Sequence, residues 1–295
     1  MKRIQNLVLF LTVLAFCKGT AEDSAVLKPE GFKRIELVSA VKSVTPGKAF
    51  RVGLLFTLAP EYHTYWRGPG VVGVAPSFEW DLPEGFEVGK TYWPAPEVVD
   101  MAGIKANGYH GEALIITELT PPASLEAKKV SLKVRSAWMA CASSCQPGVG
   151  DFSITLPVHT TDALTQPNSA LEEKFKETLE AIPPPSPGDW EWQATREDAT
   201  ISLQLNLPDS GEPREFEGVH FFSDDMQVDS DEPQVTSTPQ TGGFDLVQKL
   251  PVPDFAPKNP KQLSGLLFNA KGWPGLDSKY VEVNIPWTLS PTEHE

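Results

Sequence analysis

Short segments in which apolar and polar residues alternate run through most of this 295-residue chain. The clearest segment lies between Ala49 and Leu58. Every second residue there is apolar: Phe50, Val52, Leu54, Phe56 and Leu58. A β-strand turns successive side chains to opposite faces, so a period of two predicts a strand with one buried face. The chain also has 28 prolines and 22 glycines, which suit turns between such strands. Together these features predict an all-β chain built of β-sandwiches.

The alternating segments fall into two groups, which we interpret as two domains. The first predicted domain covers residues 30–160, with further strands near 114–116, 130–138 and 152–158. The second covers residues 190–290. Its predicted strands are 201–207, 216–222, 244–250, 263–268 and 280–285, each bounded by Gly, Pro, Asp or Asn. The second group contains no cysteine, and we expect it to be structural or to bind a partner.

Residues 161–189 differ from both groups and predict a short helix followed by a linker. Ser169 and Glu172 have the spacing of a capping box. Apolar residues then recur at helical intervals: Leu171, Phe175, Leu179 and Ile182. The proline-rich segment 183–187 ends the helix, because proline lacks an amide donor and fixes its own backbone angle. We expect it to act as a stiff linker.

The first 21 residues are typical of a secretory signal peptide. Lys2 and Arg3 precede an apolar run from Leu7 to Phe16, and small residues lead to a predicted cleavage after Ala21. The alternative is a lipoprotein anchor at Cys17, although bulky Phe16 stands where a small residue is expected. Elsewhere the sequence has no apolar stretch long enough for a membrane helix. The sequence therefore predicts an exported protein.

The formal net charge is −14 at pH 7. An acidic surface repels phosphate backbones and anionic lipids, so nucleic acid is excluded as an expected partner. No motif predicts a cofactor.

Two cysteines remain if Cys17 leaves with the signal peptide, and they are separated by three residues. In an exported protein Cys141 and Cys145 are expected to form a disulfide. Closing so short a loop stabilises a fold by only about 2 kcal/mol in the chain-entropy model. The spacing by itself leaves three readings open: a redox-active pair, a structural hairpin bridge, or a metal site.

Other soft or borderline metal ligands are dispersed in the sequence. They are His63, His110, Met101 and Met139, and with the thiols they raise the possibility of Cu(I). Their spacing does not form a ligand cluster. We expect the histidines to form hydrogen bonds within turns and the methionines to pack, with no bound metal.

Five segments between residues 63 and 147 occur in the order of a known family. They are His-Thr-Tyr-Trp-Arg-Gly-Pro-Gly at 63–70, Phe-Glu-Trp-Asp-Leu-Pro-Glu-Gly at 78–85, Trp-Pro-Ala-Pro at 93–96, Gly-Tyr-His-Gly-Glu at 108–112, and the segment 138–147 with both cysteines. In these segments the chain resembles the N-terminal periplasmic domain of the thiol:disulfide interchange protein DsbD, particularly the version in the copper-sensitivity suppressor ScsB. The second half resembles more loosely the second β domain of the ScsB type, through residues 221–222 and 263–267.

The resemblance implies two immunoglobulin-like β-sandwich domains and a periplasmic location. It implies that the Cys141/Cys145 pair receives reducing equivalents from a membrane-embedded DsbD-like donor and passes them to oxidised periplasmic proteins. By the same resemblance, Cys145 forms mixed disulfides with partners and Cys141 resolves them. Exchange needs reachable sulfur under a movable cover, for which Tyr65 or Tyr109 is a candidate.

The chain also departs from the family pattern. It ends at Glu295 without the transmembrane conduit and thioredoxin-like domain of the parent proteins, so a separate donor is expected. Gln146 and Gly148 replace the residues expected around the proline after the second cysteine. The alternative function is a non-enzymatic envelope binding module or copper metallochaperone, in which the disulfide is structural.

Overall fold

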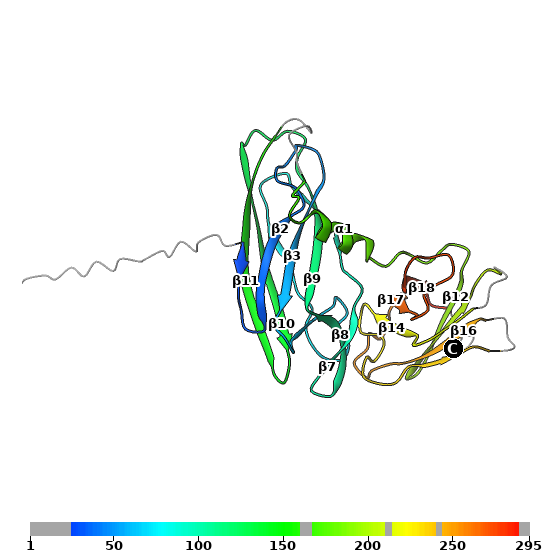
Figure 1. Ribbon diagram of the computed structural model, residues 1–295. Helices are drawn as coiled ribbons and strands as arrows, with labels where there is room; N and C mark the ends of the chain where they lie inside the picture. Colours follow the sequence, from blue (N-terminus) through cyan, green and yellow to red (C-terminus); the bar gives the residue numbers. More distant parts are fainter. Residues whose placement is uncertain (1–24, 160–166, 210–213, 240–243, 289–295) are drawn as a thin grey trace, which may run out of the picture.

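The computed structural model describes residues 25–159, 167–209, 214–239 and 244–288. These residues form antiparallel β-sheets and one helix (Figure 1). The predicted signal peptide, its cleavage site and Cys17 lie outside the described residues. Within the described ranges, no helix is both long and apolar enough to cross a membrane.

Two antiparallel sheets pack face to face in the N-terminal half. The five-stranded sheet has the order β1-β2-β3-β9-β6, with β1 at Val26–Leu27, β2 at Phe32–Ser39, β3 at Phe50–Leu58, β9 at Glu112–Thr120 and β6 at Glu87–Tyr92. The other sheet has the order β11-β10-β4-β8-β7, with β5 paired on β10. Its strands are β11 (Cys145–Pro157), β10 (Lys129–Cys141), β4 (His63–Tyr65), β8 (Ile104–His110), β7 (Glu97–Met101) and β5 (Glu79–Asp81).

The alternation predicted between Ala49 and Leu58 is confirmed as strand β3. Leu54 and Phe56 point into the sandwich, where they share a buried cluster with Val134 and Phe152 of the opposite sheet. Val52 joins a second cluster with apolar residues of β10 and β11. The apolar face of β3 therefore holds the two sheets together by burial of hydrocarbon surface.

Helix α1 (Glu172–Glu180) covers the outer face of the five-stranded sheet. Phe175 is buried against a cluster that includes Leu55 and Ile116. The predicted capping box at Ser169 is wrong, because the helix begins after Leu171 and no side chain caps it. Asn168 instead accepts the first amide hydrogen bonds of this turn through its backbone carbonyl oxygen.

The C-terminal half contains two smaller antiparallel sheets. One has the order β12-β13-β16-β15, with β12 at Glu191–Glu197, β13 at Thr200–Asn206, β16 at Leu246–Pro251 and β15 at Val235–Ser237. The other has the order β14-β17-β18, with β14 at His220–Ser223, β17 at Gln262–Phe268 and β18 at Tyr280–Pro286. One buried cluster lies between them. The strand predicted at 216–222 begins only at His220, because Phe216 packs on this cluster from a loop and Glu217 bonds to the Asn269 side chain.

The two halves dock on each other, which the sequence left open. Trp66 and Tyr109 of the first half share a cluster with Phe222 and Leu266 of the second. Beside this cluster the Arg67 guanidinium donates to both carboxylate oxygens of Asp224, at 2.6 and 3.2 Å. In Figure 1, β14 and β17 accordingly lie next to β7 and β8.

Candidate disulfide site at the end of the β10–β11 hairpin

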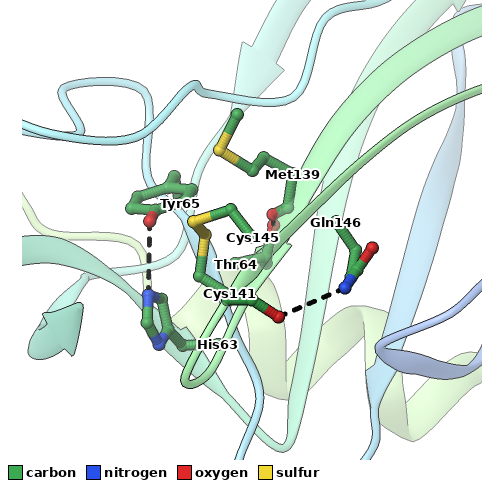
Figure 2. Close-up of a disulfide and its surroundings, with 8 residues drawn as sticks. His63, Thr64, Tyr65, Met139, Cys141, Cys145 and Gln146 are labelled. Carbon is green, nitrogen blue, oxygen red and sulfur yellow. Dashed lines mark hydrogen bonds between the residues drawn. A yellow bond between two sulfur atoms is a disulfide. The ribbon is translucent and has the colours of Figure 1, made fainter. Parts of the chain in front are cut away.

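Strands β10 and β11 form a long hairpin that carries both cysteines at its tip. Thirteen residues of each strand pair, and the last pair is Cys141 with Cys145. A disulfide joins the two, with their Cα atoms 4.1 Å apart (Figure 2). The sequence pattern predicts that the first strand ends near Trp138 and that the second begins near Phe152. Both strands in fact continue to the cysteines, because main-chain pairing persists through Gln146, Pro147 and Gly148, where no apolar alternation marks a strand.

The two cysteines of the disulfide differ in solvent exposure. Cys141 has no exposed surface, whereas Cys145 is partly exposed. Cys141 is part of a buried cluster with Tyr65, Val99 and Ala106, and four partly buried residues complete the shell: Val72, Met101, Met139 and Cys145. In this conformation a partner can reach the disulfide only from the Cys145 side.

Strand pairing brings two histidines into line with the disulfide. In the order β8, β4, β10, β11, the directly opposed residues are His110, His63, Cys141 and Cys145. Directly opposed residues in antiparallel strands project to the same face. Residues far apart in the sequence therefore form one row across four strands.

His63 is buried beside the disulfide, with 1% of its surface exposed. Its Nε2 lies 3.4 Å from the hydroxyl oxygen of Tyr65, and Figure 2 shows both groups on the same side of the S–S bond. Burial, and then the charge of nearby His110, lower the pKa of His63 from 6.5, while Asp100 opposes the shift. Burial raises the pKa of Tyr65 to about 12. At neutral pH both side chains are therefore uncharged.

His110 lies at the solvent side of the row. Its ring centroid is 5.7 Å from that of His63, and its side chain is 48% exposed. The Nδ1 atom and the backbone amide of His110 both bond to Oε1 of Glu97, at 2.8 and 2.9 Å. These contacts hold the imidazole in place. The sequence does not predict a role for Glu97, because nothing in the local sequence indicates that its carboxylate contacts His110.

Of the two tyrosines considered as a cover, only Tyr65 lies at the disulfide. Tyr109 points to the other side of the sheet, into the cluster between the two halves, and its hydroxyl donates to the Pro94 carbonyl oxygen at 2.8 Å. Adjacent residues of a strand face opposite ways, so His110 and Tyr109 cannot both face the cysteines.

The candidate metal ligands are only partly brought together. Met101 and Met139 lie in the shell of the disulfide, and His63 is next to Cys141. His110 is one strand further away. In the part of the chain that the structure describes, no group of three or more His, Cys, Asp or Glu residues could hold a metal ion. His63 and His110 lie in strands rather than in the turns expected for them, because pairing with Cys141 extends β4 through residue 63.

The fold and site define a class of protein: an all-β, immunoglobulin-like sandwich that carries a disulfide with one buried and one reachable sulfur. Residues 35–157 match the family "Thiol:disulfide interchange protein DsbD, N-terminal". The resemblance that the sequence shows to the DsbD N-terminal family is therefore confirmed over residues 35–157.

One solved structure supports this fold. The chain is similar to the N-terminal periplasmic domain of ScsB from Proteus mirabilis, with 21% identity and a TM-score of 0.55, over 86% of this chain and 93% of that one. It is also similar to the DsbD N-terminal domain of Neisseria meningitidis in the reduced form, with 18% identity and a TM-score of 0.27, over 44% of this chain and 89% of that one. No curated protein matches the chain.

Proposed function

We propose that this protein is a periplasmic thiol–disulfide interchange protein that relays reducing equivalents through Cys141 and Cys145. Its donor would be a membrane-embedded DsbD-like protein, and its acceptors would be oxidised periplasmic proteins. The family of residues 35–157 supports an interchange role. The observation that carries the proposal is the unequal accessibility of the two cysteines at the hairpin tip.

From the unequal accessibility of the two cysteines we infer that their sulfurs act in different steps. In the reduced protein, the Cys145 thiolate attacks the disulfide of an acceptor and forms a mixed disulfide, while one acceptor sulfur leaves as a thiolate. Cys141 then attacks the Cys145 sulfur, which closes the internal disulfide and releases the second acceptor thiolate. Two electrons pass to the acceptor. A membrane-embedded dithiol would reverse these steps to reduce the protein again.

Stability alone does not account for this disulfide. Its three-residue loop contributes only about 2 kcal/mol in the chain-entropy model. The ladder of β10 and β11 already holds the two strand ends together. A bridge that adds little stability to a protein with large cores favours a redox role.

The reduction potential of the purified protein tests the proposal. Equilibration in glutathione or dithiothreitol buffers should give a reversible value well above roughly −300 mV, below which structural disulfides usually lie. Cys141→Ser should accumulate mixed disulfides with partners, because Cys145 can still attack but cannot be released. Cys145→Ser is the matched control and should trap none. A bond that is reduced only when the protein unfolds would contradict the proposal and favour a binding module with a structural bridge.

A further inference from the structure

The row His110, His63, Cys141, Cys145 places a neutral imidazole next to the buried cysteine. Directly opposed residues of antiparallel strands have Cβ atoms about 4.5–5.5 Å apart. The imidazole of His63 is thus within reach of the Cys141 sulfur without any movement of the backbone. Figure 2 shows the ring beside the S–S bond.

The burial of Cys141 disfavours the thiolate form that the exchange reaction needs. A thiol in an apolar shell keeps its proton, because burial disfavours the thiolate. Only the thiolate attacks a disulfide. Cys141 therefore needs a proton acceptor at the moment when it resolves the mixed disulfide on Cys145.

Among the polar groups around the Cys141 sulfur, His63 is the one suited to accept its proton. The Tyr65 hydroxyl keeps its own proton, since burial raises the pKa of Tyr65 to about 12. Asp100 is exposed in the β7–β8 hairpin, and its carboxylate accepts the Gly103 amide hydrogen bond at 2.8 Å. The His110 imidazole is one strand further from the sulfur. His63 is next to the sulfur, uncharged at neutral pH, and therefore able to take a proton.

We propose that His63 is the general base that activates Cys141 in the resolving step, a role that rests on the interchange function proposed above. The Cys141 thiol gives its proton to the His63 imidazole, and the resulting thiolate attacks the Cys145 sulfur. The Cys141–Cys145 bond forms as the bond between Cys145 and the partner breaks, and the partner leaves as a thiolate. The imidazolium then loses its proton towards solvent on the side of His110 and Glu97. In the reverse direction, His63 first takes a proton from solvent, and its imidazolium then protonates the departing Cys141 thiolate.

The experiment follows the two steps separately with an aromatic disulfide, 5,5′-dithiobis(2-nitrobenzoate). The reduced protein should release two thionitrobenzoate ions per molecule. The first comes from attack by Cys145, and the second from resolution by Cys141. Stopped-flow absorbance then reports both rates. General-base catalysis contributes about 10²–10⁴-fold, so His63→Gln should slow the second release by at least about tenfold and leave the first unchanged.

The pH profile separates this role from a structural one. Proton transfer from Cys141 to His63 stays within the protein, so the wild-type second release should be independent of pH from about 7 upwards until the thiol itself ionises. In His63→Gln the rate should rise about tenfold per pH unit, because the thiol must lose its proton to solvent. His110, Asp100, Tyr65 and the two thiols are the titratable groups around His63. His159→Gln is the control for replacing a histidine elsewhere.

The outcomes for the two proposals are distinct. Failure of the wild-type protein to release any thionitrobenzoate would overturn the interchange function itself. Two normal releases in wild type and His63→Gln, with the same pH profile, would overturn only the role of His63. If His63→Gln does not fold, the wild-type profile still decides, because a second release that rises tenfold per pH unit throughout the neutral range excludes an internal base.

Discussion

Burial near the boundary between the two halves changes the pKa of one side chain, that of His220. It lies at the start of β14, and its ring centroid is 4.5 Å from that of Phe222. Its Nε2 has no hydrogen-bond partner. Burial, and then the positive charge of Lys105 from the first half, lower the pKa of His220 from 6.5 to about 4. The folded protein therefore keeps this imidazole neutral where the unfolded chain would protonate it.

This shift predicts a loss of stability in mild acid. The contribution of His220 is fully present above pH 6.5 and is lost as the pH falls towards about 4, because the unfolded state binds the proton first. At about 1.36 kcal/mol per pKa unit, the loss reaches about 3 kcal/mol. Urea unfolding of wild type and His220→Gln at several pH values gives the free energy of unfolding of each protein as a function of pH. The loss is the difference between these two curves. Parallel curves between pH 6.5 and 4 would refute the prediction.

At the scale of elements, the β10–β11 hairpin depends on close packing between its strands and the core. Gly148 lies directly opposite Trp138, three residues after Cys145. A Cβ atom on Gly148 would lie 2.5 Å from Nε1 of Trp138, well inside van der Waals contact. The indole lies over the glycine and fills the space that a side chain would need. Packing thus favours glycine at this position.

Gly148→Ala should therefore destabilise the protein by about 1–3 kcal/mol, the usual cost of overpacking. The indole of Trp138 would have to shift out of its cluster with Phe32 and Phe152. Gly188→Ala is the matched control, because a Cβ there meets nothing within 4 Å. Equilibrium unfolding in urea measures both variants. Equal stability of Gly148→Ala and the control would show that the indole can move at no cost.

At the scale of the whole molecule, the second half contacts residues 66–71, which directly follow strand β4 of the disulfide site. Trp66 and Arg67 come directly after Tyr65 and contact Phe222 and Asp224 of the second half. Further along, the Ser230 hydroxyl accepts from the Val71 amide at 3.0 Å. The contacts between the halves thereby fix the chain that leaves strand β4, on which His63 and Tyr65 lie.

Gly68→Val should separate the two halves, because a Cβ on Gly68 would lie 2.0 Å from the Ser223 carbonyl oxygen. Each half has buried clusters of its own, so we expect both to remain folded. Small-angle X-ray scattering should show a larger radius of gyration, and calorimetry should show two transitions in place of one. Gly188→Ala again serves as control. An unchanged radius of gyration would mean that the interface adapts to the added side chain.

Much of the fold was predictable from the sequence, because the signals involved are local. The period of two in residues 50–58 identifies β3 and its inner face, since alternation follows from the geometry of any strand. The helical spacing of Leu171, Phe175 and Leu179 identifies α1, although not its first residue. The presence of two cysteines, Cys141 and Cys145, in a chain predicted to be exported predicts the disulfide that the structure contains. The domain boundaries at 30–160 and 190–290 remain predictions.

The tertiary structure alone decided what depends on contacts between distant residues. Leu55 faces away from the sandwich and is buried only because α1 lies on it. Cys141 is buried and Cys145 reachable because β4 and its neighbours cover one side of the hairpin tip, which no spacing reveals. His63 and His110 lie in one row with the disulfide because of the register of β8, β4 and β10. The sequence by itself thus determined the strands, the helix and the cysteine pair. Long-range strand pairing decided which cysteine is exposed and which imidazole lies beside the buried one.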